Sequence, residues 1–115
     1  GLFSFDGRQG DFTKTQWQNV DFGGGSGYDA DFAGADLSQA RIESCDLSGV
    51  NFSLTKIDGI KIIDPVSLKN LVIAKNQIPD LIKGIELIRP KEFESQVKEL
   101  GEQEALEKYF EIVII

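Results

Sequence analysis

The sequence predicts a mainly β fold, in which a short stack of coils is followed by a C-terminal α-helical cap and tail. Two observations support this prediction. A five-residue pattern repeats through the first half of the chain and stops at about residue 62. Signals typical of helices replace it from residue 64 onward. We therefore divide the 115 residues into a repeat region, residues 1–63, and a cap region, residues 64–115.

The repeat combines small, polar and large residues in a constant order. Every fifth residue from Phe12 to Ile62 is large and apolar, except Gly27. The residue two places earlier is mostly small or β-branched, and the residue between them is polar. A period of five matches neither the roughly 3.6-residue turn of an α-helix nor the simple alternation of a strand. It fits an extended triplet followed by a two-residue turn, so each unit forms one short wall of a coil.

The large apolar residues of each triplet should point into the coil and fill its axis. The ten residues that we predict to form the structural core are Phe12, Trp17, Phe22, Phe32, Leu37, Ile42, Leu47, Phe52, Ile57 and Ile62. The recurring Asp residues need no metal to explain them, because Asp and Asn side chains bond to nearby backbone in turns. Cys45 falls in the small inward column, so we expect it to be buried and unreactive.

Several units resemble the repeats of the pentapeptide-repeat family, which read roughly Ala-(Asp/Asn)-Leu-x-x. The closest are residues 30–34 (ADFAG), 35–39 (ADLSQ), 45–49 (CDLSG) and 50–54 (VNFSL). The resemblance implies a right-handed quadrilateral β-helix in which four units close one coil, so this chain would hold about three coils. It also implies that residues twenty positions apart stack over one another.

The glycine-rich run from Gly23 to Gly27 (GGGSG) keeps the register but supplies no side chain to the core. We interpret it as a flexible loop, natural or engineered, since Gly/Ser runs behave as random coil. A phosphate-binding loop is the less favoured alternative, because neither a following Lys nor the Gly-x-Gly-x-x-Gly spacing is present.

Helix signals begin after the repeats. Asp64 and Pro65 have the chemistry of an N-cap and a first helical position, and they predict a helix that runs through Val72. A second short helix is predicted over residues 76–83, followed by a strand over residues 85–88. A third helix of roughly 18 residues would begin at Pro90. We expect these elements to cover the last coil, whose open strand edges would otherwise invite aggregation.

The chain ends in an apolar segment that predicts a strand. Its candidate partner-binding residues are Ile112, Val113, Ile114 and Ile115. One interpretation pairs this strand with residues 85–88. The other makes it an open edge that recruits another chain by β-addition. This second interpretation predicts a homo-oligomer that forms through the C-terminal helix or strand.

The composition excludes several functions. Twelve basic against nineteen acidic residues give a net charge of -7, which disfavours direct nucleic-acid binding. The chain has no histidine and one cysteine, so it lacks His-based catalytic triads, most zinc sites and any internal disulfide. We predict no cofactor, no metal and no catalytic residue. The single cysteine fits a reducing compartment, and we expect a cytoplasmic protein that does not bind membranes.

These features predict a non-enzymatic scaffold or protein-interaction module whose protein partner the sequence does not identify. The family resemblance implies one alternative, since some bacterial members are acidic rods that imitate duplex DNA and bind DNA gyrase. Three coils at about 4.8 Å give a rod roughly 15 Å long, which is short for such a mimic. Arg41, Lys56 and Lys61 also interrupt the acidic column. Because the repeat already runs at residue 1 and no Met begins the chain, we expect a fragment of a longer protein.

Overall fold

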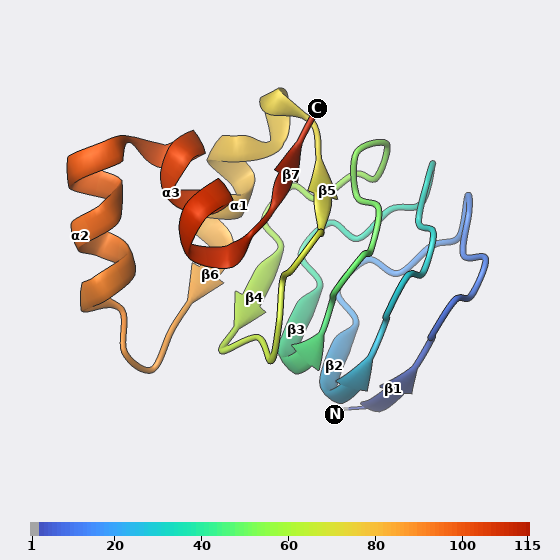
Figure 1. Cartoon of the computed structure of the whole chain (residues 1–115). Coiled ribbons are helices and arrows are strands. Elements are labelled where there is room, and N and C mark those ends of the chain that lie inside the picture. The colour runs from blue at the N-terminus through green and yellow to red at the C-terminus, as the bar shows by residue number, and fades with distance from the viewer. Residues whose placement is uncertain (1–2) are drawn as a thin grey trace.

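Parallel strands stack along one axis, and helices cover one end of the stack (Figure 1). The computed structural model describes residues 3–115, with side chains from Asp6 onward. The strands are β1 (Phe3–Asp6), β2 (Asp21–Ser26), β3 (Arg41–Asp46), β4 (Lys61–Ile63), β5 (Val72–Ile73), β6 (Ile85–Glu86) and β7 (Val113–Ile114). The helices are the 3-10 turn η1 (Lys75–Gln77), α1 (Ile78–Gly84), α2 (Lys91–Leu100) and α3 (Glu102–Phe110).

The twenty-residue spacing is visible in the strand register. The largest sheet has the order β1-β2-β3-β4-β6, and each neighbouring pair is parallel. Within it Phe22 pairs with Ile42, and Ile42 pairs with Ile62. Isolated bridges repeat this spacing on two further walls: Asp11–Asp31, Asp31–Asn51, Gln16–Asp36 and Asp36–Lys56. Residues twenty positions apart therefore lie side by side on successive coils.

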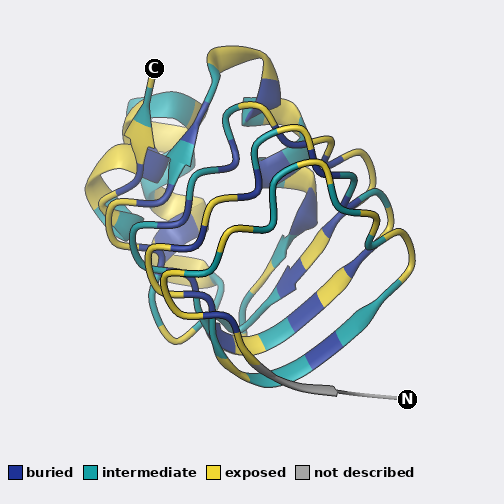
Figure 2. Cartoon of the chain, turned by 90° about the vertical axis from the view of Figure 1, so that its right-hand side faces the viewer, coloured by how far each residue is buried: buried dark blue, intermediate teal, exposed yellow. Residues whose placement is uncertain are grey.

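The stack buries its large apolar residues along the axis. Eight of the ten predicted core residues are buried, while Phe12 and Trp17 are partly buried and pack against them. The Phe12 and Phe32 rings stack with centroids 5.1 Å apart, and Phe32 meets Phe52 edge to face at 5.9 Å. Figure 2 shows how buried and exposed residues recur along the coils. The inward column is thus a continuous apolar core.

The polar middle residue of each unit organises the turn that follows it. The Asp36 carboxylate accepts a hydrogen bond from the Ser38 backbone N–H at 2.9 Å and another from the Ser38 hydroxyl. Asn51 and Ser53 repeat this pattern three units further along the chain. The bond from the Ser38 hydroxyl is the main cause that lowers the pKa of Asp36 below its ordinary value. These acids serve turn geometry, as local Asx-type bonding predicts.

The glycine-rich run is a strand, so its interpretation as a flexible loop was wrong. Residues 21–26 form β2, which pairs with β1 on one side and β3 on the other. Gly24 and Gly25 have φ values of +75° and +108°, which only glycine adopts readily. Main-chain hydrogen bonds to two neighbours hold the segment extended although it carries almost no side chains.

The stacked backbone continues past residue 63, and the helix predicted from Asp64 to Val72 does not form. Bridges instead join Asp46 to Ser67 and Asn51 to Val72, one residue beyond the usual spacing. Asp64 has a φ of +43°, and the Val66 N–H donates to the Cys45 carbonyl at 2.9 Å. The preceding coil offers a complete row of main-chain partners, and pairing with it overrides the local capping signals. Residue 63 marks the end of the sequence pattern but not the end of the stack.

The cap begins with α1 and ends with two helices where the sequence predicted one. Helix α1 and strand β6 lie where the sequence predicts a short helix and a strand. Helix α1 reaches the last coil at Gly84, where a Cβ would collide with the Ile60 carbonyl oxygen. The long helix predicted from Pro90 is broken at Gly101, whose φ of +86° ends α2 and lets α3 turn back beside it. The backbone of Gly101 has a positive φ that only glycine adopts readily, and it ends the helix although the apolar periodicity continues.

The aromatic column should carry much of the stability of the stack. Replacing Phe32 by Ala removes a ring that is 3% exposed, and we expect a loss of about 3–5 kcal/mol in the free energy of unfolding. Urea unfolding followed by circular dichroism measures this change. Phe12→Ala is the control, and we expect a smaller loss, below about 2 kcal/mol, because that ring is only partly buried. A Phe32→Ala loss below about 0.5 kcal/mol would contradict the placement.

The turn hydrogen bond can be tested by titration. Ser38→Ala should raise the pKa of Asp36 toward its ordinary value, because the hydroxyl that holds the carboxylate ionised is lost. A lowered folded pKa stabilises the fold above the unfolded pKa, and this contribution disappears as the pH falls through the folded pKa. Carboxyl-carbon NMR measures the shift. Ser53→Ala acts on the turn of Asn51, which does not titrate, and should leave Asp36 unchanged.

Candidate functional site

The C-terminal apolar segment lies on the stack rather than beside residues 85–88. Strand β7 pairs in parallel with β5, whereas β6 pairs with β4, so the predicted pairing with residues 85–88 was wrong. Ile112 is buried, whereas Val113 and Ile115 are 40% and 66% exposed. Residues 85–88 and residues 112–115 are both largely apolar, so their sequences do not say which strand the C-terminal segment pairs with. The path of α3 brings that segment to β5.

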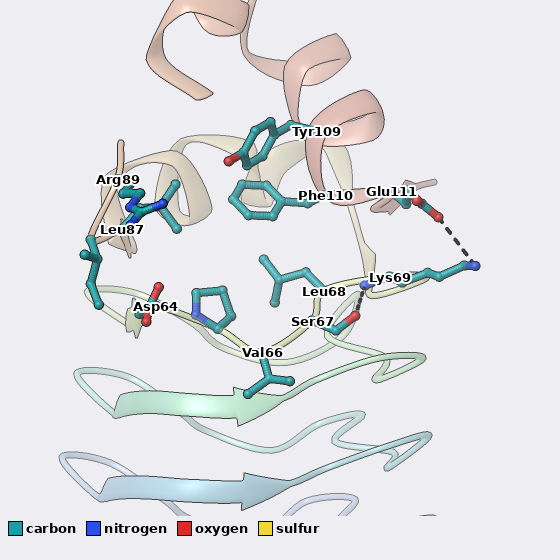
Figure 3. Close-up of a pocket in the computed structure, with 12 residues that line it drawn as sticks. Asp64, Val66, Ser67, Leu68, Lys69, Leu87, Arg89, Tyr109, Phe110 and Glu111 are labelled. Carbon is teal, nitrogen blue, oxygen red and sulfur yellow. Dashed lines mark hydrogen bonds and ion pairs between the residues drawn. The ribbon is translucent and has the colours of Figure 1, made fainter. Parts of the chain in front are cut away.

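The main hollow of the cap is a groove where helices and stack meet (Figure 3). Its volume is about 650 Å³. The last coil forms one wall with residues 64–69, the β6–α2 connection forms a second with residues 87–89, and the end of α3 forms a third with residues 109–111. We call this hollow the cap groove. A volume of this size lies in the range of roughly 300–1,000 Å³ that ligand pockets occupy.

Apolar side chains on the rim of the cap groove are exposed. Leu68 is buried, but Ile88 is 77% exposed and Leu87, Tyr109 and Phe110 are partly exposed. Val66 is 69% exposed, but its side chain points away from Tyr109 and Phe110 in Figure 3. In Figure 3, Tyr109 and Phe110 face the coil across the groove. Exposed apolar residues that lie scattered need no explanation, whereas several around one hollow indicate a binding surface.

An aromatic cluster fixes the helical wall. Phe93 on α2 lies 5.4 Å from Tyr109 and 4.9 Å from Phe110, measured between ring centroids. Tyr109 and Phe110 meet edge to face at 4.8 Å. Such pairs contribute about 0.5–1.5 kcal/mol beyond the burial of their area. The cluster therefore holds the end of α3 in place over the groove.

The charges of the cap groove are divided between its two sides. Lys69 and Glu111 form an ion pair of 3.7 Å on one side, and both side chains are more than 60% exposed, so the pair contributes little. Arg89 lies on the opposite side in Figure 3, with Asp64 below it. Within residues 3–115, neither Arg89 nor Asp64 forms an ion pair.

The connection between β6 and α2 leaves its backbone open. In the described part of the chain, the N–H and C=O groups of Leu87, Ile88 and Arg89 make no hydrogen bond to protein. Strand β6 is also the last strand of its sheet, so it has no neighbour on its outer side. One wall of the groove therefore offers unpaired donors and acceptors beside apolar side chains.

The remaining chemistry of the molecule is sparse. Across residues 3–115, no three His, Cys, Asp or Glu side chains cluster closely enough to hold a metal ion. Cys45 is buried in the stack with its Sγ 3.3 Å from the Gly24 carbonyl oxygen, and burial raises the pKa of its thiol. A raised thiol pKa lowers reactivity. None of the helices described here is both long and apolar enough to cross a membrane.

Comparison with protein families agrees with the geometry of the stack. A family model described as pentapeptide repeats matches residues 18–53 and 28–61, with eight copies. Residues 18–61 are pentapeptide repeats. Comparison with curated proteins and with solved structures gave no match. The pentapeptide repeats end at residue 61, whereas every residue that lines the cap groove lies at or beyond residue 64.

Sequence reasoning did not find the cap groove. It placed Asp64 to Val72 in a helix, and it named Ile112 to Ile115 as the candidate partner surface. Of the groove residues, only Glu111 adjoins that segment. The one available signal was Ile88 followed by Arg89, an apolar and a cationic residue just before a proline. That signal is weak, because the groove exists only where three distant segments meet.

The turn from α3 into β7 depends on a strained residue. Glu111 has a φ of +58°, and its carbonyl accepts the Asn70 N–H at 2.8 Å. Glu111→Gly should raise the free energy of unfolding by about 0.5–1 kcal/mol, because relief of left-handed strain exceeds the loss of an exposed ion pair. Glu107→Gly, within α3, should lower it by about 1 kcal/mol. Thermal unfolding measures both changes. If Glu111→Gly lowered the free energy of unfolding as Glu107→Gly does, Glu111 would not be strained.

Proposed function

We propose that this pentapeptide-repeat protein is a non-enzymatic interaction module that binds a protein partner through the cap groove. The observation that carries the proposal is the group of exposed apolar side chains around a hollow of about 650 Å³. A rigid stack supports one wall of this hollow, and a fixed aromatic cluster supports another. Binding sites on rigid elements hold their geometry without ordering costs.

We infer that the stack is a right-handed quadrilateral β-helix. Four pairing positions recur within one twenty-residue coil, as expected for a four-sided coil: Asp11–Asp31, Gln16–Asp36, Asp21–Arg41 and Ser26–Asp46. Right-handed connections between parallel strands are strongly favoured. We also propose that the protein works in a reducing compartment, the cytoplasm, where its one buried cysteine stays a free thiol.

The distribution of charge does not favour an imitation of DNA. On one wall Asp21 pairs with Arg41 and Arg41 pairs with Lys61, so the charge changes sign between coils. On another wall Lys56 follows Asp36. A duplex mimic needs a continuous row of negative charge. We therefore propose no gyrase-directed function for this chain.

A homo-oligomer through the C-terminal helix or strand stays a prediction. Val113 on β7 and Ile115 just after it are exposed, and they are the apolar side chains that such a contact would bury. Ile112 is buried within the chain and does not belong to that surface. Light scattering coupled to size exclusion measures the oligomeric state.

The interaction function is testable with a pair of matched variants. Ile88 and Leu54 are 77% and 72% exposed, but only Ile88 lines the cap groove. Tagged chains are used to capture partners from extract of the source cells. Ile88→Asp should lose the partners that the unchanged chain captures, and Leu54→Asp should keep them. Both variants should unfold within about 0.5 kcal/mol of the parent, because neither side chain is buried. Equal capture by all three chains would refute binding at the groove.

A further inference from the structure

We propose that the cap groove binds an extended, apolar peptide segment of the partner that carries a carboxylate next to its anchoring side chain. The inference rests on the proposed interaction function and adds the chemistry of the partner. Arg89 binds the carboxylate, residues 87–89 bind the peptide backbone, and the apolar rim receives the anchoring side chain.

The open backbone indicates a peptide rather than a smooth apolar surface. Leu87, Ile88 and Arg89 present both N–H and C=O groups that bond to nothing else among the described residues. An extended peptide offers the complementary groups at a matching spacing, as in strand addition to a sheet edge. Strand β6 pairs with β4 and ends at Glu86, immediately before these residues, so their main-chain groups begin where that pairing stops.

The charges of the groove select a carboxylate. Two cations line it in the described structure: Lys69 is paired with Glu111, and Arg89 has no ion-pair partner. A guanidinium binds a carboxylate through paired, charge-assisted hydrogen bonds. In Figure 3, Arg89 projects from the same wall as Leu87, so an acid held there lies beside the open backbone.

The apolar rim supplies the anchor position. Ile88 is exposed, and Tyr109 lies across the groove from the coil. A large apolar side chain of the peptide would cover these residues and remove their surface from water. Asp64 lies below Arg89 and has no ion-pair partner in residues 3–115, so its negative charge opposes an acidic ligand. Removing the charge of Asp64 should therefore strengthen peptide binding, whereas removing the charge of Arg89 should weaken it.

The test uses the full chain and a displayed library of random linear peptides. We expect the selected peptides to share an Asp, a Glu or a terminal carboxylate within two positions of a large apolar residue. Fluorescence anisotropy then measures the dissociation constant of one selected peptide. Arg89→Gln should weaken binding by about tenfold or more, because the charge-assisted bonds are lost. Asp64→Asn should strengthen it by about two- to fivefold, because a nearby negative charge is removed.

Arg8→Gln is the matched control. It removes the same charge from the N-terminal end of the stack, where Arg8 pairs with Asp6, and should change binding by less than about twofold. Selected peptides that lack a carboxylate, or an Arg89→Gln variant that binds like the parent, would overturn the proposal. So would a library that yields no binder. If Ile88→Asp still loses captured partners while the peptide result is negative, the interaction function stands and only the peptide chemistry fails.

Discussion

Main-chain hydrogen bonding between successive parallel coils is the interaction on which the rest of this structure depends. It joins N–H and C=O groups whatever side chains they carry, so it extends through segments that the repeat pattern does not describe. The glycine-rich strand β2 is held by it on both sides. Residues 64–73 are drawn into it as well, although their local signals favour a helix. Once the backbone is stacked, the side chains decide only which face is inside.

The cap covers the open strand edge of the last coil, and the groove forms where this cover is incomplete. A stack of parallel strands ends in an unpaired edge, and such edges aggregate unless they are covered. Strand β7 covers β5, and α1 lies against the coil at Gly84. The cover is incomplete between the coil and the end of α3, and the cap groove is the space that remains.

The two halves of the chain thus have different roles. The pentapeptide repeats build a regular stack of parallel strands and turns, in which outward residues such as Asp36 and Asn51 form hydrogen bonds within the turns. On two of their walls, Asp21–Arg41–Lys61 and Gln16–Asp36–Lys56, the charge changes sign between coils. The cap carries the irregular features, namely backbone groups without hydrogen bonds, exposed apolar side chains and an arginine that forms no ion pair with the described residues. Recognition depends on such irregular features, and regular repeats support them.

The sequence by itself determined the repeat period, the inward column from Phe12 to Ile62 and the short helix that became α1. These follow from local, repeated constraints, because each five-residue unit meets the same neighbours and carries the same signal. Only the tertiary structure decided that residues 64–73 stay in the stack, that Gly101 divides the last helix and that β7 meets β5. The tertiary structure also decided the groove, which is lined by Val66, Ile88 and Tyr109 from three separate segments. Each of these outcomes depends on contacts between segments far apart in sequence, where the free energy of pairing with a preformed coil exceeds any local preference.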